Sequence, residues 1–200
     1  MFDLGGVLVD IDFTCALRSW AAHSPLPFDE IKRRYQFDHA YERHERGEIS
    51  AGDYFSHIAH TLELSASEQQ VEFGWNAIFT GEITTTRLLV EQARRQIPCY
   101  AFTNTTASHM ATWSRLYPRV VPAFDRVYAS HEIGVRKPDG IAFEYICRDT
   151  GIEPSAFLFF DDLPANVHAA TAAGLQAVLV RSPEDAAVSL RALGIATRAA

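Results

Sequence analysis

The feature of this sequence that most constrains its fold is the alternation, from residue 84 onward, of short apolar segments with helical ones. Four segments have strand character, at residues 98–102, 124–129, 156–160 and 175–180. A helical segment at residues 84–96 precedes them, and helical segments at residues 107–116, 140–150 and 164–173 separate them. A last helix begins near residue 183. Apolar strands that alternate with helices are typical of a parallel sheet covered on both faces. The sequence therefore predicts an α/β fold with a doubly wound parallel sheet.

A further strand-like segment opens the chain and is very short. Phe2 leads to Asp3, and Gly5 and Gly6 then break the pattern. A carboxylate placed where a buried strand meets a glycine turn exposes an oxygen to ligands, although such residues also form ordinary turns. Asp3 is therefore a candidate nucleophile or metal ligand. Because central strands usually have about five or six residues, either this strand is stubby or the native chain begins before residue 1.

Residues 13–79 have helical periodicity and no strand signal. We expect four helices, at 13–22, at 28–46 with Gly47 after its end, from a cap at Ser50, and from a cap at Ser67 to Phe79. Four helices in succession indicate a helical subdomain inserted into the α/β core. The predicted division is a core of residues 1–12 and 82–200 and a helical cap of residues 13–81.

Composition narrows the class of protein. A formal net charge of −7 argues against a nucleic-acid groove, which needs a basic face. No apolar run approaches the roughly 18 residues that span a bilayer, and the N-terminus lacks signal-peptide features. Cys15, Cys99 and Cys147 are widely spaced and odd in number, which favours reduced thiols. These observations predict a cytoplasmic protein.

Polar residues follow three of the predicted strands at the point where each ends. They are Asp3, the pair Thr103 and Asn104, and the pair Asp161 and Asp162. Each group alone has an ordinary explanation as a helix cap or a turn. Because ligands of doubly wound sheets bind outside the carboxyl ends of the strands, all three groups are expected at one edge.

The chemistry of these groups suits phosphate esters. Paired carboxylates hold Mg²⁺, a cation that prefers oxygen ligands. A hydroxyl, an amide and a lysine would supply donors to a transferring phosphoryl group. Of the 18 basic residues only Lys32 and Lys137 are lysines, which suggests that Lys137, between Arg136 and Pro138, provides a compact ammonium.

In this order the groups resemble the motifs of the haloacid dehalogenase-like (HAD) hydrolase superfamily. The resemblance covers nearly the whole chain and rests on segment 2–8, residues 103–105, Lys137 with Pro138, and residues 160–162 with Asn166. The helices of residues 13–81 lie where this superfamily inserts its helical cap. Segment 44–50 and the run of residues 9–12 are most similar to the bacterial glucose-1-phosphatase-like branch.

The resemblance implies an aspartyl-phosphate mechanism. Asp3 would attack phosphorus, and water would then release phosphate. Mg²⁺ would be bound by Asp3, the Gly5 carbonyl and an acid of the fourth motif, with Asp162 preferred to Asp161. Thr103, Asn104 and Lys137 would bind the phosphate, and Lys137 would also offset the repulsion among the three carboxylates.

Gly5 is a departure from the family pattern, in which a second aspartate normally stands two positions after the nucleophile as general acid and base. Three explanations are open: a substrate with a good leaving group such as a sugar 1-phosphate, a proton supplied by Glu45 or His44, or vestigial activity. General acid–base catalysis is typically worth about 10²–10⁴ in rate.

The sequence thus predicts a Mg²⁺-dependent phosphomonoester hydrolase acting on a small, sugar-like phosphate ester, with no nucleic-acid or membrane partner. One alternative is a catalytically silent phosphate- or metal-binding protein, which the residue at position 5 would suit. The other is a metal-independent 2-haloacid dehalogenase, which would leave Asp161 and Asp162 unexplained. The sequence predicts no oligomeric state.

Overall fold

The sheet is built around the first three residues, and the computed structural model describes residues 1–195. Phe2 forms parallel bridges to Ala101 of β3 (Tyr100–Thr103) and to Phe160 of β5 (Leu158–Asp161). β3 pairs in parallel with β4 (Arg126–Ala129), and β5 pairs in parallel with β6 (Gln176–Leu179). The order across the sheet is therefore β4, β3, residues 1–3, β5 and β6, with every strand parallel.

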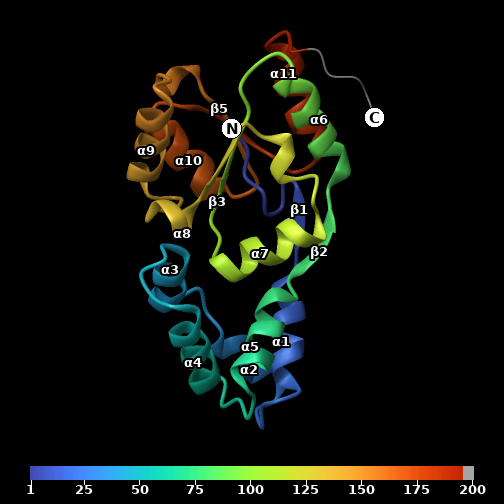
Figure 1. The fold of residues 1–200 in the computed structure, drawn as a ribbon, viewed down its shortest axis with the longest axis vertical. Helices are drawn as coiled ribbons and strands as arrows, with labels where there is room; N and C mark the ends of the chain where they lie inside the picture. The colour runs from blue at the N-terminus through green and yellow to red at the C-terminus, as the bar shows by residue number, and fades with distance from the viewer. Residues whose placement is uncertain (196–200) are drawn as a thin grey trace.

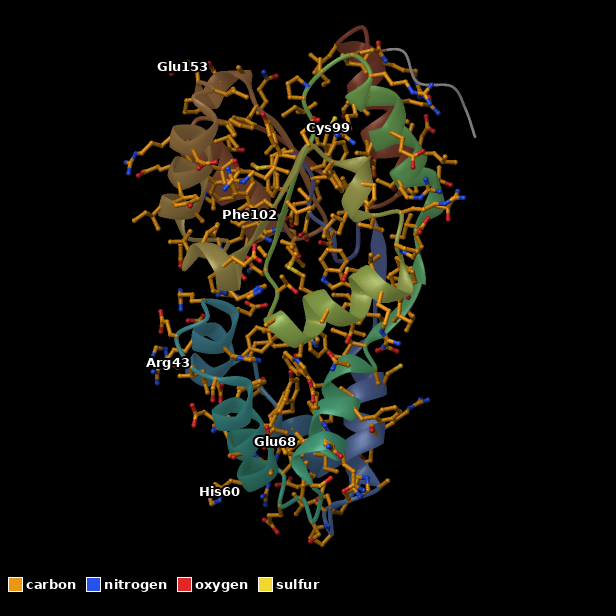
Figure 2. The ribbon with its side chains drawn as sticks, in the orientation of Figure 1. Arg43, His60, Glu68, Cys99, Phe102 and Glu153 are labelled. Carbon is orange, nitrogen blue, oxygen red and sulfur yellow. The ribbon has the colours of Figure 1, made fainter. Side chains whose placement is uncertain are left out.

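Helices cover both faces of this sheet because alternate side chains of each strand point to opposite sides. Phe2 and Phe160 lie in one hydrophobic cluster, and Phe102 and Phe159 lie in another. Figure 2 shows Phe102 in the interior of the sheet-containing half. The first cluster includes residues of α6 (Thr84–Arg94) and α11 (Pro183–Ala192), and the second includes residues of α9 (Gly140–Thr150) and α10 (Pro164–Ala172) (Figure 1). The predicted doubly wound α/β fold is confirmed.

Five helices between β1 (Val9–Ile11) and β2 (Phe79–Glu82) form a second half, here called the helical lobe (Figure 1). Its hydrophobic cluster is separate from those of the sheet and contains fully buried Trp20, Tyr54 and Trp75. Ser50 and Ser67 cap two of its helices, as the sequence predicts. The five helices are α1 (Phe13–Ala21), α2 (Phe28–Arg34), α3 (His39–Glu45), α4 (Ala51–Thr61) and α5 (Glu68–Asn76).

The helix predicted at residues 28–46 is wrong in one respect, because it is two helices, α2 and α3. The backbone of Tyr35 is extended, and the Asp38 carboxylate accepts a hydrogen bond from the Tyr41 backbone N–H. Apolar spacing continues across the break, but an aspartate that caps a new helix ends the previous one. The break leaves Phe37 outside both helices and 59% exposed.

A second difference is the antiparallel pair of β1 with β2, which joins the helical lobe to the sheet. Phe79, expected to end a helix, lies in β2. These strands have three and four residues and contain Asp10 and Gly81, so neither carries a periodic signal of its own. Their pairing joins segments about 70 residues apart, a contact that local pattern does not encode. The division at residues 81–82 falls within β2 and stays a prediction.

Two of the remaining helices bring the two halves together: α7 (Ala107–Leu116) contacts α5, and the short α8 (Ser130–Ile133) contacts α3. Two 3₁₀ turns, Val121–Ala123 and Pro154–Ala156, pack within the sheet half. Gly47, just after α3, has φ +69, and a Cβ atom there would lie 2.5 Å from the His131 carbonyl oxygen. This glycine therefore permits the close approach of the helical lobe to α8. The three cysteines are free, and no helix within residues 1–195 has the length and apolarity needed to cross a membrane.

Candidate active site

Lys137 lies at the centre of the site and joins two carboxylates. Its Nζ lies 2.7 Å from Asp3 Oδ1 and 2.7 Å from Asp161 Oδ2, and its side chain is 1% exposed. The same Nζ lies 5.2 Å and 5.3 Å from the ring centroids of Phe102 and Phe159. Burial lowers the pKa of Lys137, but the two carboxylates more than offset this effect and the net pKa is raised. Lys137 is therefore a buried ammonium held between charges of opposite sign.

Asp3 ends the central strand and faces the glycine turn. Burial raises its pKa from 3.8 to about 7, with repulsion from Asp161 adding to the rise and Lys137 opposing it. Lys137 occupies Oδ1 of Asp3, and the same carboxylate lines the adjoining cavity. The carboxylate is thus oriented by one lysine and left accessible to a ligand, as a nucleophile requires.

Asp161 and Asp162 have different surroundings although they are adjacent. Asp161 is fully buried and accepts hydrogen bonds from Lys137 Nζ, Asn166 Nδ2 and the Leu163 backbone N–H, which engage both of its oxygens. No donor from another residue in the described chain reaches the Asp162 carboxylate. Burial and the neighbouring Asp161 raise the pKa of Asp162, and the charge of Lys137 offsets this rise only in part.

The three carboxylates make a donor set suited to a divalent cation. Asp3, Asp161 and Asp162 each offer an oxygen, and these atoms lie within 4.8 Å of one another. Gly6 lets the backbone approach the Asp162 carboxylate closely: its φ is +69, and a Cβ there would lie 2.2 Å from Asp162 Oδ2. Hard oxygen ligands in an acidic cluster fit Mg²⁺.

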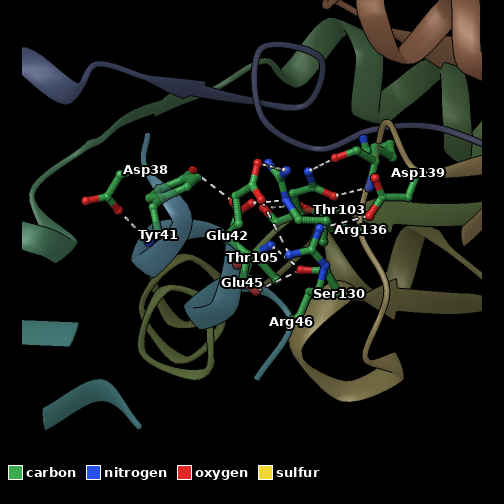
Figure 3. Close-up of polar contacts among 12 residues, drawn as sticks. Asp38, Tyr41, Glu42, Glu45, Arg46, Thr103, Thr105, Ser130, Arg136 and Asp139 are labelled. Atoms are coloured by element: carbon green, nitrogen blue, oxygen red, sulfur yellow. Dashed lines mark hydrogen bonds and ion pairs between the residues drawn. The ribbon is translucent and has the colours of Figure 1, made fainter. Parts of the chain in front are cut away.

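The loops after β3 and β4 are tied to each other beside this cluster (Figure 3). The Asn104 side chain donates to the Lys137 carbonyl oxygen at 2.8 Å and accepts from the Lys137 backbone N–H at 2.9 Å. Ser130 Oγ accepts from the Thr105 backbone N–H and donates to the Thr105 carbonyl oxygen. Asn104 therefore fixes the loop that carries Lys137, a role that sequence reasoning did not assign to it.

A cavity of about 390 Å³ opens beside these residues, within the usual range of small-molecule sites. Of the seven residues that the sequence assigns to catalysis, phosphate binding or metal binding, all but one line it. The exception is Asp161, which lies beneath. The lining candidates are Asp3, Gly5, Thr103, Asn104, Lys137 and Asp162, with Asn166.

The helical lobe contributes a second wall that sequence reasoning largely missed. Glu45 lines the cavity and pairs through Oε2 with Arg136 Nε at 2.8 Å, while its Oε1 accepts from the Tyr41 hydroxyl (Figure 3). Burial raises the pKa of Glu45 against the opposing effect of Arg136. His44 instead stacks on Tyr54 inside the helical lobe, with ring centroids 4.6 Å apart. Arg136 adjoins Lys137 in sequence, and this adjacency was the available signal.

Two further ion pairs link the same elements. Arg46, after α3, lies 3.0 Å from Asp139 at the start of α9, and Arg136 also reaches Glu42 at 3.3 Å. These contacts connect α3 of the helical lobe to the loop that carries Lys137 (Figure 3). The wall formed by the helical lobe is therefore held against the loop that carries Lys137 by charged groups.

The sequence profile of the haloacid dehalogenase-like hydrolase family matches residues 1–174. The chain belongs to this family. It is thus a hydrolase, as the sequence predicts, and its relatives include phosphatases.

Two curated relatives and one solved structure illustrate the similarity. The chain is 31% identical to a phosphatase of Mycobacterium tuberculosis over 90% of this chain and 85% of the relative. It is 24% identical to D-ribitol-5-phosphate phosphatase of Bacteroides thetaiotaomicron over 84% of each chain. A HAD-family enzyme of Bacteroides thetaiotaomicron, solved with magnesium and inorganic phosphate, is 25% identical, with a TM-score of 0.78 over 90% of this chain and 92% of that one.

Proposed function

We propose that this protein hydrolyses small phosphate monoesters with Mg²⁺ through an aspartyl-phosphate on Asp3. The observation that carries the proposal is the placement of Lys137 between Asp3 and Asp161, next to the unpartnered carboxylate of Asp162. Relatives named as phosphatases, and a neighbour solved with magnesium and phosphate, support the same chemistry.

The first half-reaction uses the carboxylate that Lys137 orients. A free oxygen of Asp3 forms a bond to phosphorus, the bond from phosphorus to the ester oxygen breaks, and that oxygen leaves as an anion with the electron pair and takes a proton from solvent. Water then attacks phosphorus, the bond to Asp3 breaks, one proton of the water returns to solvent, and hydrogen phosphate is released with the carboxylate restored. The fixed ammonium of Lys137 stabilises the negative charge that develops on the phosphoryl group.

The other site residues hold the reactants in place. We assign Asp3, the Gly5 carbonyl and Asp162 as the groups that would hold Mg²⁺, which would neutralise phosphoryl oxygens when bound. Asp161 instead serves as the buried partner that orients Lys137, because its oxygens are engaged by three donors. Thr103 lines the cavity and would donate its hydroxyl to the phosphate.

The helical lobe would act as the cap that closes this cavity, since Glu45 reaches it from α3. A silent binding protein and a metal-independent dehalogenase are the alternatives. The dehalogenase would not require the unpartnered Asp162, and the silent protein would bind phosphate without turnover. The sugar-like leaving group and the cytoplasmic location stay predictions.

The test is phosphate release from phenyl phosphate with Mg²⁺ and with EDTA, for wild type, Asp3→Asn and Asp29→Asn. Asp29 is an exposed acid on α2 and serves as the matched control. We expect turnover that needs metal, vanishes in Asp3→Asn and persists in Asp29→Asn. Wild-type protein that binds Mg²⁺ and phosphate but releases no phosphate from any ester would overturn the proposal.

A further inference from the structure

We propose that the preferred substrate is an aryl phosphate, in which phosphate is esterified to an apolar, aromatic leaving group. This inference rests on the proposed function and adds the chemical class of the leaving group. It comes from the apolar side chains that line the cavity together with the phosphate-binding residues, and from glycine at position 5.

Exposed apolar side chains gather at this cavity from three separate segments. Ile11 of β1 is 41% exposed, Phe37 between α2 and α3 is 59% exposed, and Leu163 after β5 is 53% exposed, and all three line the cavity. Large exposed apolar side chains that converge on one concave site mark a surface that binds an apolar partner. A leaving group seated here would cover them.

The helical-lobe side of the cavity is aromatic. The rings of Phe13 and Phe37 lie 5.0 Å apart in an edge-to-face arrangement, and the rings of Phe37 and Tyr41 lie 4.7 Å apart. All three residues line the cavity. Aromatic rings at such spacings accept a further ring in offset or edge-to-face geometry.

The Glu45 carboxylate on the same side is already satisfied by protein donors. The Tyr41 hydroxyl donates to Glu45 Oε1, and Glu45 Oε2 accepts from Arg136 Nε. A sugar placed here would have to break these contacts or leave its hydroxyls without partners, and unpaired buried polar groups weaken binding strongly. An apolar ring has no hydroxyl groups that would be left without hydrogen-bond partners there.

Glycine at position 5 also favours an aryl leaving group. No carboxylate stands there to protonate the departing oxygen, and both oxygens of Glu45 are already engaged, Oε1 by the Tyr41 hydroxyl and Oε2 by Arg136 Nε. A phenol, with a pKa near the ~10 of tyrosine, leaves as its anion far more readily than an aliphatic alcohol. The cavity wall and the missing acid therefore select the same class of ester.

The test compares three substrates with Mg²⁺: phenyl phosphate, benzyl phosphate and glucose 1-phosphate. Benzyl phosphate keeps the ring but has a poor leaving group, whereas glucose 1-phosphate is polar. We expect kcat/KM to be highest for phenyl phosphate, KM to be similar for the two aromatic esters, and kcat to be much lower for benzyl phosphate.

The variant Phe37→Ser tests the wall itself. We expect it to raise KM for phenyl phosphate about five- to tenfold, which is ~1–1.4 kcal/mol, and to leave inhibition by inorganic phosphate unchanged. Phe73→Ser is the matched control, because Phe73 is 74% exposed on α5 and is not among the described residues that line the cavity.

The outcomes separate this inference from the proposed function. Faster turnover of glucose 1-phosphate than of phenyl phosphate would overturn the inference and leave the phosphatase intact. An equal rise of KM in Phe37→Ser and Phe73→Ser would also overturn it. No phosphate release from any ester would overturn the proposed function, and tighter binding of phenylphosphonate than of methylphosphonate would then still identify the apolar site.

Discussion

Replacing Gly6 with alanine puts a methyl group where the Asp162 carboxylate lies, and so tests whether Asp162 holds the metal. Gly6 has φ +69, where an L-residue costs about 1–2 kcal/mol. The new Cβ would lie 2.2 Å from Asp162 Oδ2, whereas real Cβ contacts are essentially never under 3.0 Å. The carboxylate must therefore retreat by roughly 1 Å, which Mg²⁺ coordination at about 2.0–2.1 Å does not tolerate.

The positive φ should lower stability, and the displaced Asp162 carboxylate should weaken Mg²⁺ binding. We expect Gly6→Ala to lower the free energy of unfolding by about 1–2 kcal/mol through its backbone conformation. We also expect it to weaken Mg²⁺ binding at least 10–100-fold, which is ~1.4–2.7 kcal/mol, as is typical when the support of a ligand is disturbed. Gly134→Ala is the matched control, because Gly134 has φ +74 and a Cβ atom there would meet nothing within 4 Å.

The assay is calorimetric titration of Mg²⁺ into metal-free protein, with urea unfolding of both variants alongside. Both alanine variants should lose similar stability, but only Gly6→Ala should lose affinity for Mg²⁺. If Gly6→Ala binds Mg²⁺ as tightly as Gly134→Ala, Asp162 is not a ligand and the assignment is refuted. If both lose affinity equally, the loss reflects backbone strain and not the carboxylate.

Two further changes test the missing acid and the buried histidine. Gly5→Asp places a carboxyl group where it could protonate the leaving oxygen, with its Cβ 3.2 Å from Ile11 Cδ1. It should raise kcat for benzyl phosphate by up to about 10²–10⁴ and raise kcat for phenyl phosphate much less. Equal gains for both esters would contradict the leaving-group argument. His109 stacks on Trp75 with ring centroids 4.1 Å apart, and burial lowers its pKa to about 3. The imidazole is therefore neutral in the folded state, whereas in the unfolded state it takes up a proton below about pH 6.5. Stability from this group is full above that pH and is lost as pH falls, by about 1.4 kcal/mol at pH 5.5 relative to pH 7.5. Because buried carboxylates such as Asp3 change stability with pH in both proteins, the measurement is the difference between wild type and His109→Gln. Urea unfolding should show wild type changing by about 1.4 kcal/mol more in the destabilising direction than His109→Gln as pH falls from 7.5 to 5.5, and identical pH dependence in the two proteins would count against it.

The order of elements in the sheet half was readable from the chain because its strands are short, apolar and separated by helices of ordinary length. The end of the strand at residues 156–160 is an example, since four apolar residues lead directly into Asp161 and Asp162. Serine caps at Ser50 and Ser67 were readable for a similar reason, because a cap is a contact between near neighbours. The break between α2 and α3 was missed because apolar spacing continues through it.

The candidate site divides in the same way. The sequence predicted that Asp3, Thr103 and Asp162 would meet, because strand ends of a parallel sheet share one edge, and the family resemblance added Lys137. It did not predict that Asp161 is engaged by three donors while no donor from another residue reaches the Asp162 carboxylate, since both are carboxylates at adjacent positions and differ in what packs around them.

The sequence likewise did not predict the cavity wall that the helical lobe contributes. Ile11, Phe37 and Leu163 lie far apart in the chain, and nothing in their local pattern marks them as neighbours. The pair of Glu45 with Arg136 joins residues 91 positions apart. The sequence determines chemistry that follows from local periodicity and strand ends. The fold decides which distant side chains neutralise one another and which remain for a substrate, because those contacts depend on packing between elements.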